Sequence, residues 1–140
     1  MSDKVFVDTN LLIYAHDLDA GSKHDTAVGL VRDLWERGCG VISTQVLQEL
    51  YANVTRKIPA PLSRTITRRI LERYLLWQVE PNGPQTILLA SQIEERYQLS
   101  FWDAMIVASA TQGSAGQILT DDLNHGQVIE GVQIRNPFCG

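Results

Sequence analysis

Short runs rich in β-branched residues alternate along this chain with longer segments of helical periodicity, and this alternation restricts the possible folds most strongly. Strands are predicted over residues 4–8, 40–43, 77–79 and 117–120 and near 132–134. Helices are predicted over residues 11–16, 22–37, 44 to the prolines at 59 and 61, 63–75, 85–97 and 101–112. Strands joined through helices form right-handed crossovers. The pattern therefore predicts an α/β fold in which helices cover both faces of a mainly parallel sheet of about five strands.

A single domain spanning residues 1–140 is expected from the size and composition of the chain. Hydrophobic residues (44%) and charged residues (20%) occur at the frequencies of ordinary globular proteins. No apolar run approaches the ~20 residues of a membrane span, and no secretory signal is visible. Cys39 and Cys139 fit no zinc or redox spacing. These features favour a cytoplasmic protein with no membrane partner.

The charge of the chain is unevenly distributed. A formal net charge of −4 excludes a uniformly basic protein that coats nucleic acid, but it allows an enzyme that cuts nucleic acid at an acidic site. A basic run occupies residues 56–73, where Glu72 is the only acid. Its candidate phosphate-binding residues are Arg56, Lys57, Arg64, Arg68 and Arg69. Two interpretations stay open for this run, namely a track for phosphates or the solvated face of a helix.

Acidic residues stand where the predicted strands end and where a helix would otherwise be apolar. Asp8 ends the first strand, and Asp121 and Asp122 follow the fourth. Glu49 borders the apolar stripe of its helix, and Asp103 is the only charged residue within residues 101–112. Ligands of open α/β sheets bind beyond the carboxyl ends of the strands. We therefore expect these carboxylates to meet at one edge of the sheet.

Each of these acids also has a purely structural interpretation. Asp8 can cap the helix that follows it, and Ser100 with Asp103 can form a capping box. Glu49 can be a solvated side chain at the border of its helix, and the pair after the fourth strand can belong to a turn. The four positions are therefore weak signals individually and gain their meaning as a group.

A group of carboxylates needs a cation, because like charges in close proximity raise each other's pKa. Mg²⁺ or Mn²⁺ is the cation expected here, since hard cations take oxygen ligands. The three histidines, His16, His24 and His125, lack the spacing of a zinc site. The residues themselves thus predict an acidic site for Mg²⁺ or Mn²⁺.

Four short motifs extend over nearly the whole chain. They are Val-Phe-Val-Asp8-Thr9-Asn10, Ser43-Thr-Gln-Val-Leu-Gln-Glu49-Leu, Ser100-Phe-Trp-Asp103-Ala and Ile118-Leu-Thr120-Asp121-Asp122-Leu. In their order and spacing they resemble PIN-domain nucleases, and specifically the ribonuclease toxins of bacterial VapBC toxin–antitoxin pairs. The resemblance implies a PIN-like three-layer α/β/α sandwich and a Mg²⁺- or Mn²⁺-dependent endoribonuclease that hydrolyses RNA phosphodiester bonds. It also implies a homodimer and inhibition by a cognate antitoxin.

Carried over position by position, the resemblance implies four catalytic and metal-binding acids, which are Asp8, Glu49, Asp103 and Asp122. Asp121 stays open as an alternative fourth acid because it is adjacent to Asp122. Thr9 and Asn10 are expected to give polar support, and Thr120 to orient the last acid through its hydroxyl. Asn124 stands where some members carry a further acid. The basic run would then hold the phosphates that flank the cleaved bond.

Two other functions are alternatives to this hypothesis. A catalytically inactive PIN-like binding or assembly module would be favoured by the loss of a ligand acid, but all four are present. A phosphatase of the haloacid dehalogenase type requires a second Asp two residues after Asp8, where this chain has Asn10. It also requires a lysine to steady the phosphoryl group, but no lysine follows Lys57 in the sequence. Trp77 and Trp102 could stack on unpaired RNA bases, but both are more simply expected in the core.

Overall fold

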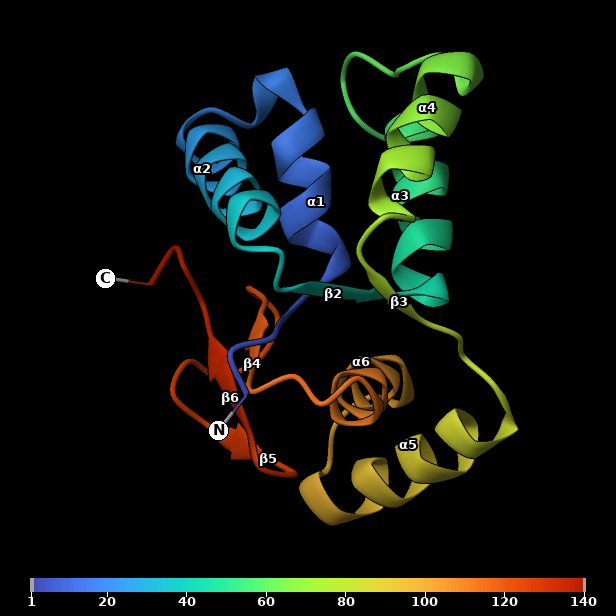
Figure 1. Cartoon of the computed structure of the whole chain (residues 1–140), viewed down its shortest axis with the longest axis vertical. Coiled ribbons are helices and arrows are strands. Elements are labelled where there is room, and N and C mark those ends of the chain that lie inside the picture. Colours follow the sequence, from blue (N-terminus) through green and yellow to red (C-terminus); the bar gives the residue numbers. More distant parts are fainter. Residues whose placement is uncertain (1, 140) are drawn as a thin grey trace.

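The computed structural model describes residues 2–139, and its central sheet confirms the predicted α/β architecture (Figure 1). Within those residues the sheet has six strands, β1 (Val5–Val7), β2 (Gly40–Ser43), β3 (Gln78–Glu80), β4 (Gln117–Leu119), β5 (Val128–Ile129) and β6 (Val132–Arg135). They follow the order β3-β2-β1-β4-β6-β5. All neighbouring pairs are parallel except β5 with β6.

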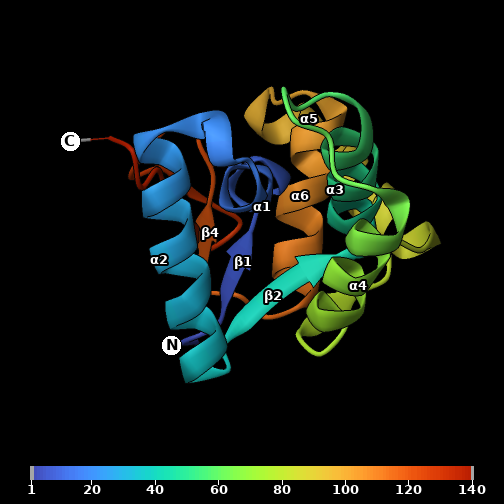
Figure 2. The ribbon, with the colours of Figure 1, turned by 90° about the horizontal axis from the view of Figure 1, so that it is seen from above.

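Helices cover both faces of this sheet and give the predicted three layers (Figures 1 and 2). One face carries α1 (Thr9–His16), α2 (Ser22–Arg37), α3 (Thr44–Arg56) and α4 (Arg64–Tyr74). The other face carries α5 (Pro84–Tyr97) and α6 (Phe101–Gln112). A short 3₁₀ helix (η1), Leu18–Ala20, connects α1 to α2. None of the helices within residues 2–139 is long and apolar enough to cross a lipid bilayer.

Local capping signals account for where several helices begin and end. The hydroxyls of Ser43, Ser63 and Ser100 each accept a hydrogen bond from the backbone N–H three residues later, at the starts of α3, α4 and α6. Gly38 ends α2 in the left-handed conformation, with φ 64°, which glycine adopts without steric cost. Pro84 occupies the first position of α5.

The structure differs from the predicted fold most clearly at two places, and β3 also begins one residue later than predicted. β5 was not predicted, because a strand of two residues is too short to show a periodic pattern. It turns through Glu130 and Gly131, both at positive φ, and pairs antiparallel with β6. In addition, α1 begins at Thr9 rather than at residue 11, because Asp8 already serves as its cap.

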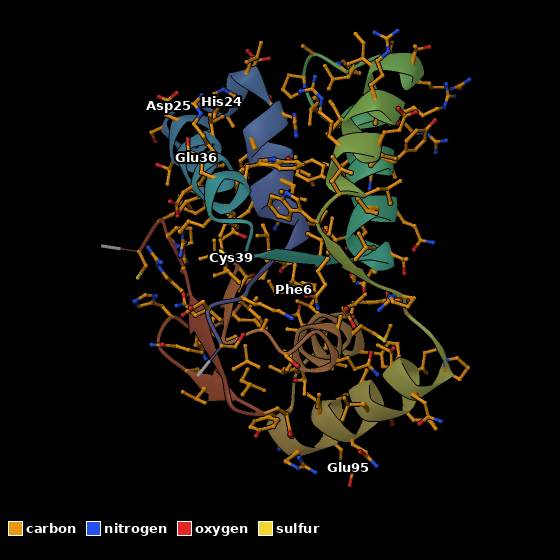
Figure 3. All side chains as sticks on the ribbon, in the orientation of Figure 1. Phe6, His24, Asp25, Glu36, Cys39 and Glu95 are labelled. Atoms are coloured by element: carbon orange, nitrogen blue, oxygen red, sulfur yellow. The ribbon has the colours of Figure 1, made fainter. Side chains whose placement is uncertain are left out.

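The sheet is buried between the two helical layers. Phe6 lies at its centre (Figure 3), and Leu12, Ile42 and Ile118 are as completely buried as Phe6. β1 pairs with β2 on one side and with β4 on the other, although β1 and β4 are far apart in the sequence. Since the three strands are parallel, their carboxyl ends lie at the same edge of the sheet. The segments that follow β1 and β4 are thereby brought side by side.

Candidate active site

Asp8 is the buried centre of the acidic region. The Thr9 N–H donates to Asp8 Oδ1 at 2.7 Å, and the Thr120 hydroxyl donates to Asp8 Oδ2 at 2.8 Å. The residue is only 6% exposed. Burial raises the pKa of Asp8 to about 7 in spite of these two hydrogen bonds, and the carboxylates of Asp122 and Glu49 raise it further. Asp8 thus caps α1 and also carries a carboxyl group that resists ionisation.

Glu49 approaches Asp8 from α3. The Thr9 hydroxyl donates to Glu49 Oε1 at 2.7 Å, while the Thr9 N–H is bound to Asp8. Glu49 is half-buried, not a fully solvated side chain at the border of its helix. Thr9, which was expected to give polar support, therefore connects two of the candidate acids.

Asp122 lies in the segment that follows β4. Its N–H donates to Thr120 Oγ1 at 3.1 Å, and the Asn10 amide donates to both of its carboxylate oxygens, at 3.3 and 3.1 Å. Partial burial and the nearby carboxylates, including those of Asp121 and Asp103, raise the pKa of Asp122. Thr120 thus contacts the backbone of Asp122 and the carboxylate of Asp8, so that one hydroxyl links the first and the last acid.

Asp103 lies in the first turn of α6. Its N–H donates to the Ser100 hydroxyl at 3.1 Å, which is one half of the predicted capping box. Within residues 2–139 the reverse bond, from the Ser100 N–H to the Asp103 carboxylate, is not formed. Instead, the negative charge of Asp103 raises the pKa of Asp122. Asp103 therefore lies near enough to the other acids for their charges to interact.

The four predicted acids form one electrostatically coupled group. They come from the end of β1, from α3, from α6 and from the segment after β4. Over residues 2–139, no set of three or more Asp, Glu, His or Cys side chains is already arranged to hold a metal ion. The donors are nevertheless all carboxylates, and this chemistry fits a hard divalent cation such as Mg²⁺ or Mn²⁺. Burial disfavours the charged form of Asp8, and such a cation would stabilise that form.

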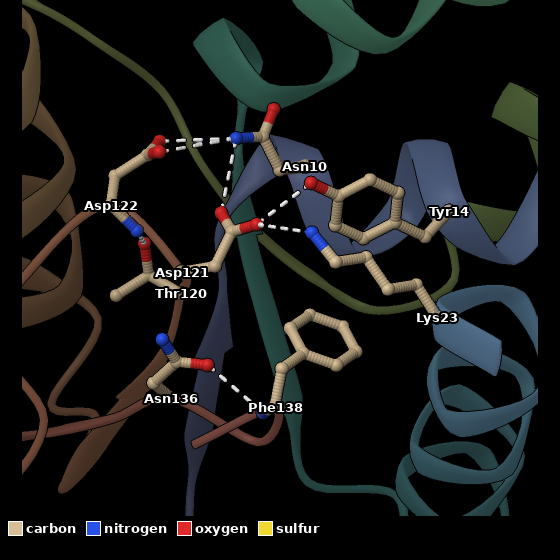
Figure 4. Close-up of polar contacts among 8 residues, drawn as sticks. All are labelled: Asn10, Tyr14, Lys23, Thr120, Asp121, Asp122, Asn136 and Phe138. Carbon is tan, nitrogen blue, oxygen red and sulfur yellow. Dashed lines mark hydrogen bonds and ion pairs between the residues drawn. The ribbon is translucent and has the colours of Figure 1, made fainter. Parts of the chain in front are cut away.

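Asp121 has a different environment from Asp122 (Figure 4). Its Oδ2 accepts a hydrogen bond from the Tyr14 hydroxyl at 2.7 Å and lies 4.0 Å from Lys23 Nζ, and its Oδ1 accepts from Asn10 at 3.1 Å. Burial and the contact with Asp121 raise the pKa of Tyr14 to about 12. Sequence reasoning missed Tyr14 and Lys23. The only sequence feature that could have indicated either residue is the position of Tyr14, one helical turn after Asn10, which places both on the same face of α1.

The remaining predicted residues lie outside this group. Asn124 is exposed, and in the described part of the chain its side chain makes no hydrogen bond to an acid. The basic residues are all exposed on α3, α4 and the segment between them. Within residues 2–139 these basic residues make no ion pair or hydrogen bond with the four candidate acids. They are Arg56, Lys57, Arg64, Arg68 and Arg69.

Helix α4 has two distinct exposed faces. One face lines a groove of about 850 Å³ whose other wall comes from α1 and α2, where Val31 and Trp35 contribute. The residues of α4 in this groove recur at helical spacing and are Ile66, Arg69, Ile70, Arg73 and Tyr74. Arg64 and Arg68 lie outside the groove. The basic run is therefore not one continuous surface.

The two tryptophans that were expected in the core have different surroundings. Trp77 is buried, with 9% of its surface exposed, as predicted. For Trp102 the prediction was wrong, because 64% of its surface is exposed. Trp102 is the second residue of α6, directly before Asp103, and its ring packs edge-on against Phe101 at 5.4 Å between centroids. An aromatic surface thus lies beside the acidic group.

Comparison with known protein families identifies the domain. Residues 5–130 match the family model of the PIN domain. No curated protein sequence matches the chain.

Solved structures share the fold at low sequence identity. A toxin–antitoxin complex from Klebsiella pneumoniae has a TM-score of 0.68 and 17% identity, covering 96% of this chain and 98% of that one. VapC20 of Mycobacterium tuberculosis, a toxin that cleaves the sarcin–ricin loop, has a TM-score of 0.66 and 19% identity, covering 85% of this chain and 92% of that one. DNA-bound VapBC from Salmonella typhimurium has a TM-score of 0.65 and 20% identity, covering 98% of this chain and 99% of that one. Because the family model spans nearly the whole sequence, the chain belongs to the PIN domain family.

Proposed function

We propose that this protein is a divalent-metal-dependent endoribonuclease of the cytoplasm and the toxin component of a toxin–antitoxin pair. One observation carries the proposal, namely that the buried carboxyl group of Asp8, with its pKa raised to about 7, lies among acids from three other parts of the chain. Such groups concentrate at functional sites, where a bound cation compensates the charge. VapC20, described as a toxin that cleaves the sarcin–ricin loop, gives support from a protein of the same fold.

The residues have separate roles in this proposal. Mg²⁺ or Mn²⁺ would be held by the four acids of the group, Asp8, Glu49, Asp103 and Asp122. The bound cation would lower the pKa of a water molecule and neutralise charge on the phosphate. Thr9 keeps Glu49 in place, and Thr120 keeps Asp8 in place, through the hydrogen bonds described above. The exposed ring of Trp102 offers a face on which an unpaired RNA base can stack.

The two alternatives have less support. A phosphatase with a nucleophilic Asp8 would need an acid at position 10, whereas Asn10 donates its amide protons to Asp121 and Asp122. An inactive module would not need a buried, electrostatically strained carboxyl group. We therefore retain the nuclease as the proposed function.

Metal removal gives the direct test of the proposed activity. We expect the purified protein to cut a single-stranded RNA in Mn²⁺ or Mg²⁺, and to leave it intact in excess EDTA. The substrate is an RNA labelled at one end, resolved on a denaturing gel, and activity should return when Mn²⁺ is added beyond the EDTA. Cleavage that continues unchanged in EDTA would contradict the metal dependence. No cleavage under any of these conditions would contradict the activity for that RNA.

The groove beside α4 suits the second part of the proposal, an antitoxin partner. It is lined by apolar side chains such as Ile66 and Trp35, which are 51% and 37% exposed. Arg69 and Arg73 at the same surface would complement an acidic segment. We propose that an apolar, acidic segment of the antitoxin occupies this groove, while Arg64 and Arg68 on the other face bind RNA phosphates. The homodimer implied by the resemblance stays a prediction.

The two faces of α4 can be separated by mutation. Replacing Arg64 and Arg68 with Gln should weaken RNA binding about equally for different sequences and reduce its salt dependence, because phosphate contacts are lost. The Ile66→Asp variant should keep RNA binding and lose binding to the product of the adjacent gene. Both proteins are measured by fluorescence anisotropy with labelled RNA in EDTA and by co-purification with that product. If Ile66→Asp instead weakened RNA binding and the Arg64 and Arg68 variant lost the partner protein, the roles of the two faces would be reversed. Unchanged RNA binding by the Arg64 and Arg68 variant would make these residues part of a solvated face.

A further inference from the structure

Asp121 is the best-anchored carboxylate beside the proposed metal site. Its side chain is 14% exposed, and both of its oxygens already have protein partners. Tyr14 donates to Oδ2, Asn10 donates to Oδ1, and the Lys23 ammonium lies 4.0 Å from Oδ2 (Figure 4). In contrast, the hydrogen bonds to the carboxylate of Asp122 come from a single group, the Asn10 amide, in the described part of the chain.

Lys23 is held in this position by two aromatic rings. Its ammonium lies 5.0 Å from the centroid of the Tyr14 ring and 5.4 Å from that of Phe138. The two rings pack edge to face, with their centroids 5.5 Å apart. Phe138 is in turn fixed by its N–H, which donates to Asn136 Oδ1 at 2.9 Å. Residues of α1, α2, the segment after β4 and the C-terminal segment therefore meet around one ammonium group.

This cluster distinguishes two adjacent carboxylates. Asp121 and Asp122 repel each other and the remaining acids, so without a compensating charge either side chain could turn toward a cation. Of these two carboxylates, the Lys23 charge and the Tyr14 hydroxyl bind that of Asp121. The backbone of Asp122 is fixed from the other side by Thr120, which also binds Asp8.

We propose that Lys23, held between Tyr14 and Phe138, is a positioning residue for the metal site: it binds Asp121 outside the ligand set and so leaves Asp122 as the fourth ligand. The inference rests on the proposed function, since it needs a cation bound by Asp8 and its neighbours. It extends that function to the C-terminal segment, because the ring of Phe138 forms one wall of the Lys23 environment.

The affinity for Mn²⁺ alone, measured by titration calorimetry on the whole chain, tests this role. Removing a positive charge near an acidic site strengthens cation binding by simple electrostatics. Loss of positioning has the opposite effect, because outer residues that orient metal ligands alter affinity by about 10–100-fold. We expect Lys23→Met to raise the Kd for Mn²⁺ about tenfold, Phe138→Leu to raise it by a smaller factor, and Lys23→Arg to restore binding. The matched control is Lys4→Met, which removes the same charge before β1, at the opposite end of that strand from Asp8.

The outcomes separate this inference from the function on which it rests. Unchanged or tighter Mn²⁺ binding by Lys23→Met would overturn the positioning role while leaving the metal site intact. Absence of Mn²⁺ binding by the wild-type protein would overturn the proposed function and the inference together. Asp122→Asn should weaken binding far more than Asp121→Asn, and the reverse order would identify Asp121 as the ligand. Thermal melts of each variant in EDTA verify that the proteins are folded.

Discussion

Asp8→Asn should reduce metal-dependent RNA cleavage more than about a hundredfold, to the level of a protein-free control, because even outer-shell changes at metal sites cost 10–100-fold. The replacement keeps an oxygen that can accept the Thr9 N–H, and the Thr120 hydroxyl can turn to accept from the new amide. What it removes is the buried negative charge that a divalent cation needs. The measurement is the rate of RNA cleavage in Mn²⁺, with toxicity on expression as a second readout.

A matched control for this variant is Asp17→Asn. Asp17 also accepts a hydrogen bond at the start of a helix, from the Asp19 N–H at 3.0 Å, but it lies beyond the end of α1, away from Asp8. We expect this control to cleave RNA as the wild-type protein does. An Asp8→Asn protein that cleaves at the wild-type rate would refute the proposed site.

Thermal stability should reveal the site without any RNA. In EDTA the coupled carboxylates repel one another, whereas Mn²⁺ binds only the assembled group and stabilises the folded state by mass action. At a Mn²⁺ concentration about 100 times the Kd, the free energy of unfolding should rise by about 2.7 kcal/mol, which shifts the Tm by several degrees. Asp103→Asn should melt higher than the wild-type protein in EDTA, because one like charge is gone, and should respond much less to Mn²⁺.

The control for these melts is Glu95→Gln. Glu95 lies on α5, and its exposed side chain points away from the rest of the molecule (Figure 3). Its replacement removes one negative charge from the protein but none from the acidic group, so its response to Mn²⁺ should equal that of the wild-type protein. Identical melting of wild type and Asp103→Asn throughout the Mn²⁺ series would leave Asp103 as an acid in the first turn of α6 with no part in a metal site.

The raised pKa of Asp8 also fixes the sign of a pH effect in EDTA. The folded protein holds a proton on Asp8 up to a pH of about 7, whereas the ordinary pKa of this carboxyl group is 3.8. Stability from this residue therefore falls as the pH rises from about 4 to about 7 and stays low above that. Asp8→Asn should thus exceed the wild-type Tm most at pH 8 and least at pH 4. The half-buried His16, whose pKa is lowered to about 4 by desolvation, has an effect of opposite sign that is the same in both proteins.

The order of elements and the position of the acids could be predicted because they depend on local signals. Apolar periodicity and capping residues mark the helices, and an acid that follows a buried strand marks the sheet edge, as at Asp8. The position of Trp102 could not be predicted in this way. The run after Ser100 is mostly apolar, with Asp103 as its one charged residue, so only the packing of α6 shows that the first turn of this helix extends beyond the core.

Contacts between distant parts of the chain could not be predicted from the sequence either. Asp121 and Asp122 are adjacent acids of the same type, and only their partners distinguish them. Those partners, Tyr14 and Lys23, lie 107 and 98 positions before Asp121, within α1 and α2. Likewise, the basic residues follow one another closely in the sequence and therefore suggested one continuous surface. In the structure Arg69 faces the groove and Arg68 does not.

The parallel pairing of β1 with β4 has a consequence for synthesis of the protein. β1 is made first, but one of its edges stays open until β4 has left the ribosome, since chains fold from the N-terminus as they emerge. Asp8 gains its Thr120 partner only then, and Asp122 follows two residues later. A nascent chain of this protein therefore carries an incomplete acidic site during most of its translation. Under the proposed ribonuclease function, the site that would cut the protein's own messenger is assembled only when the polypeptide is nearly finished.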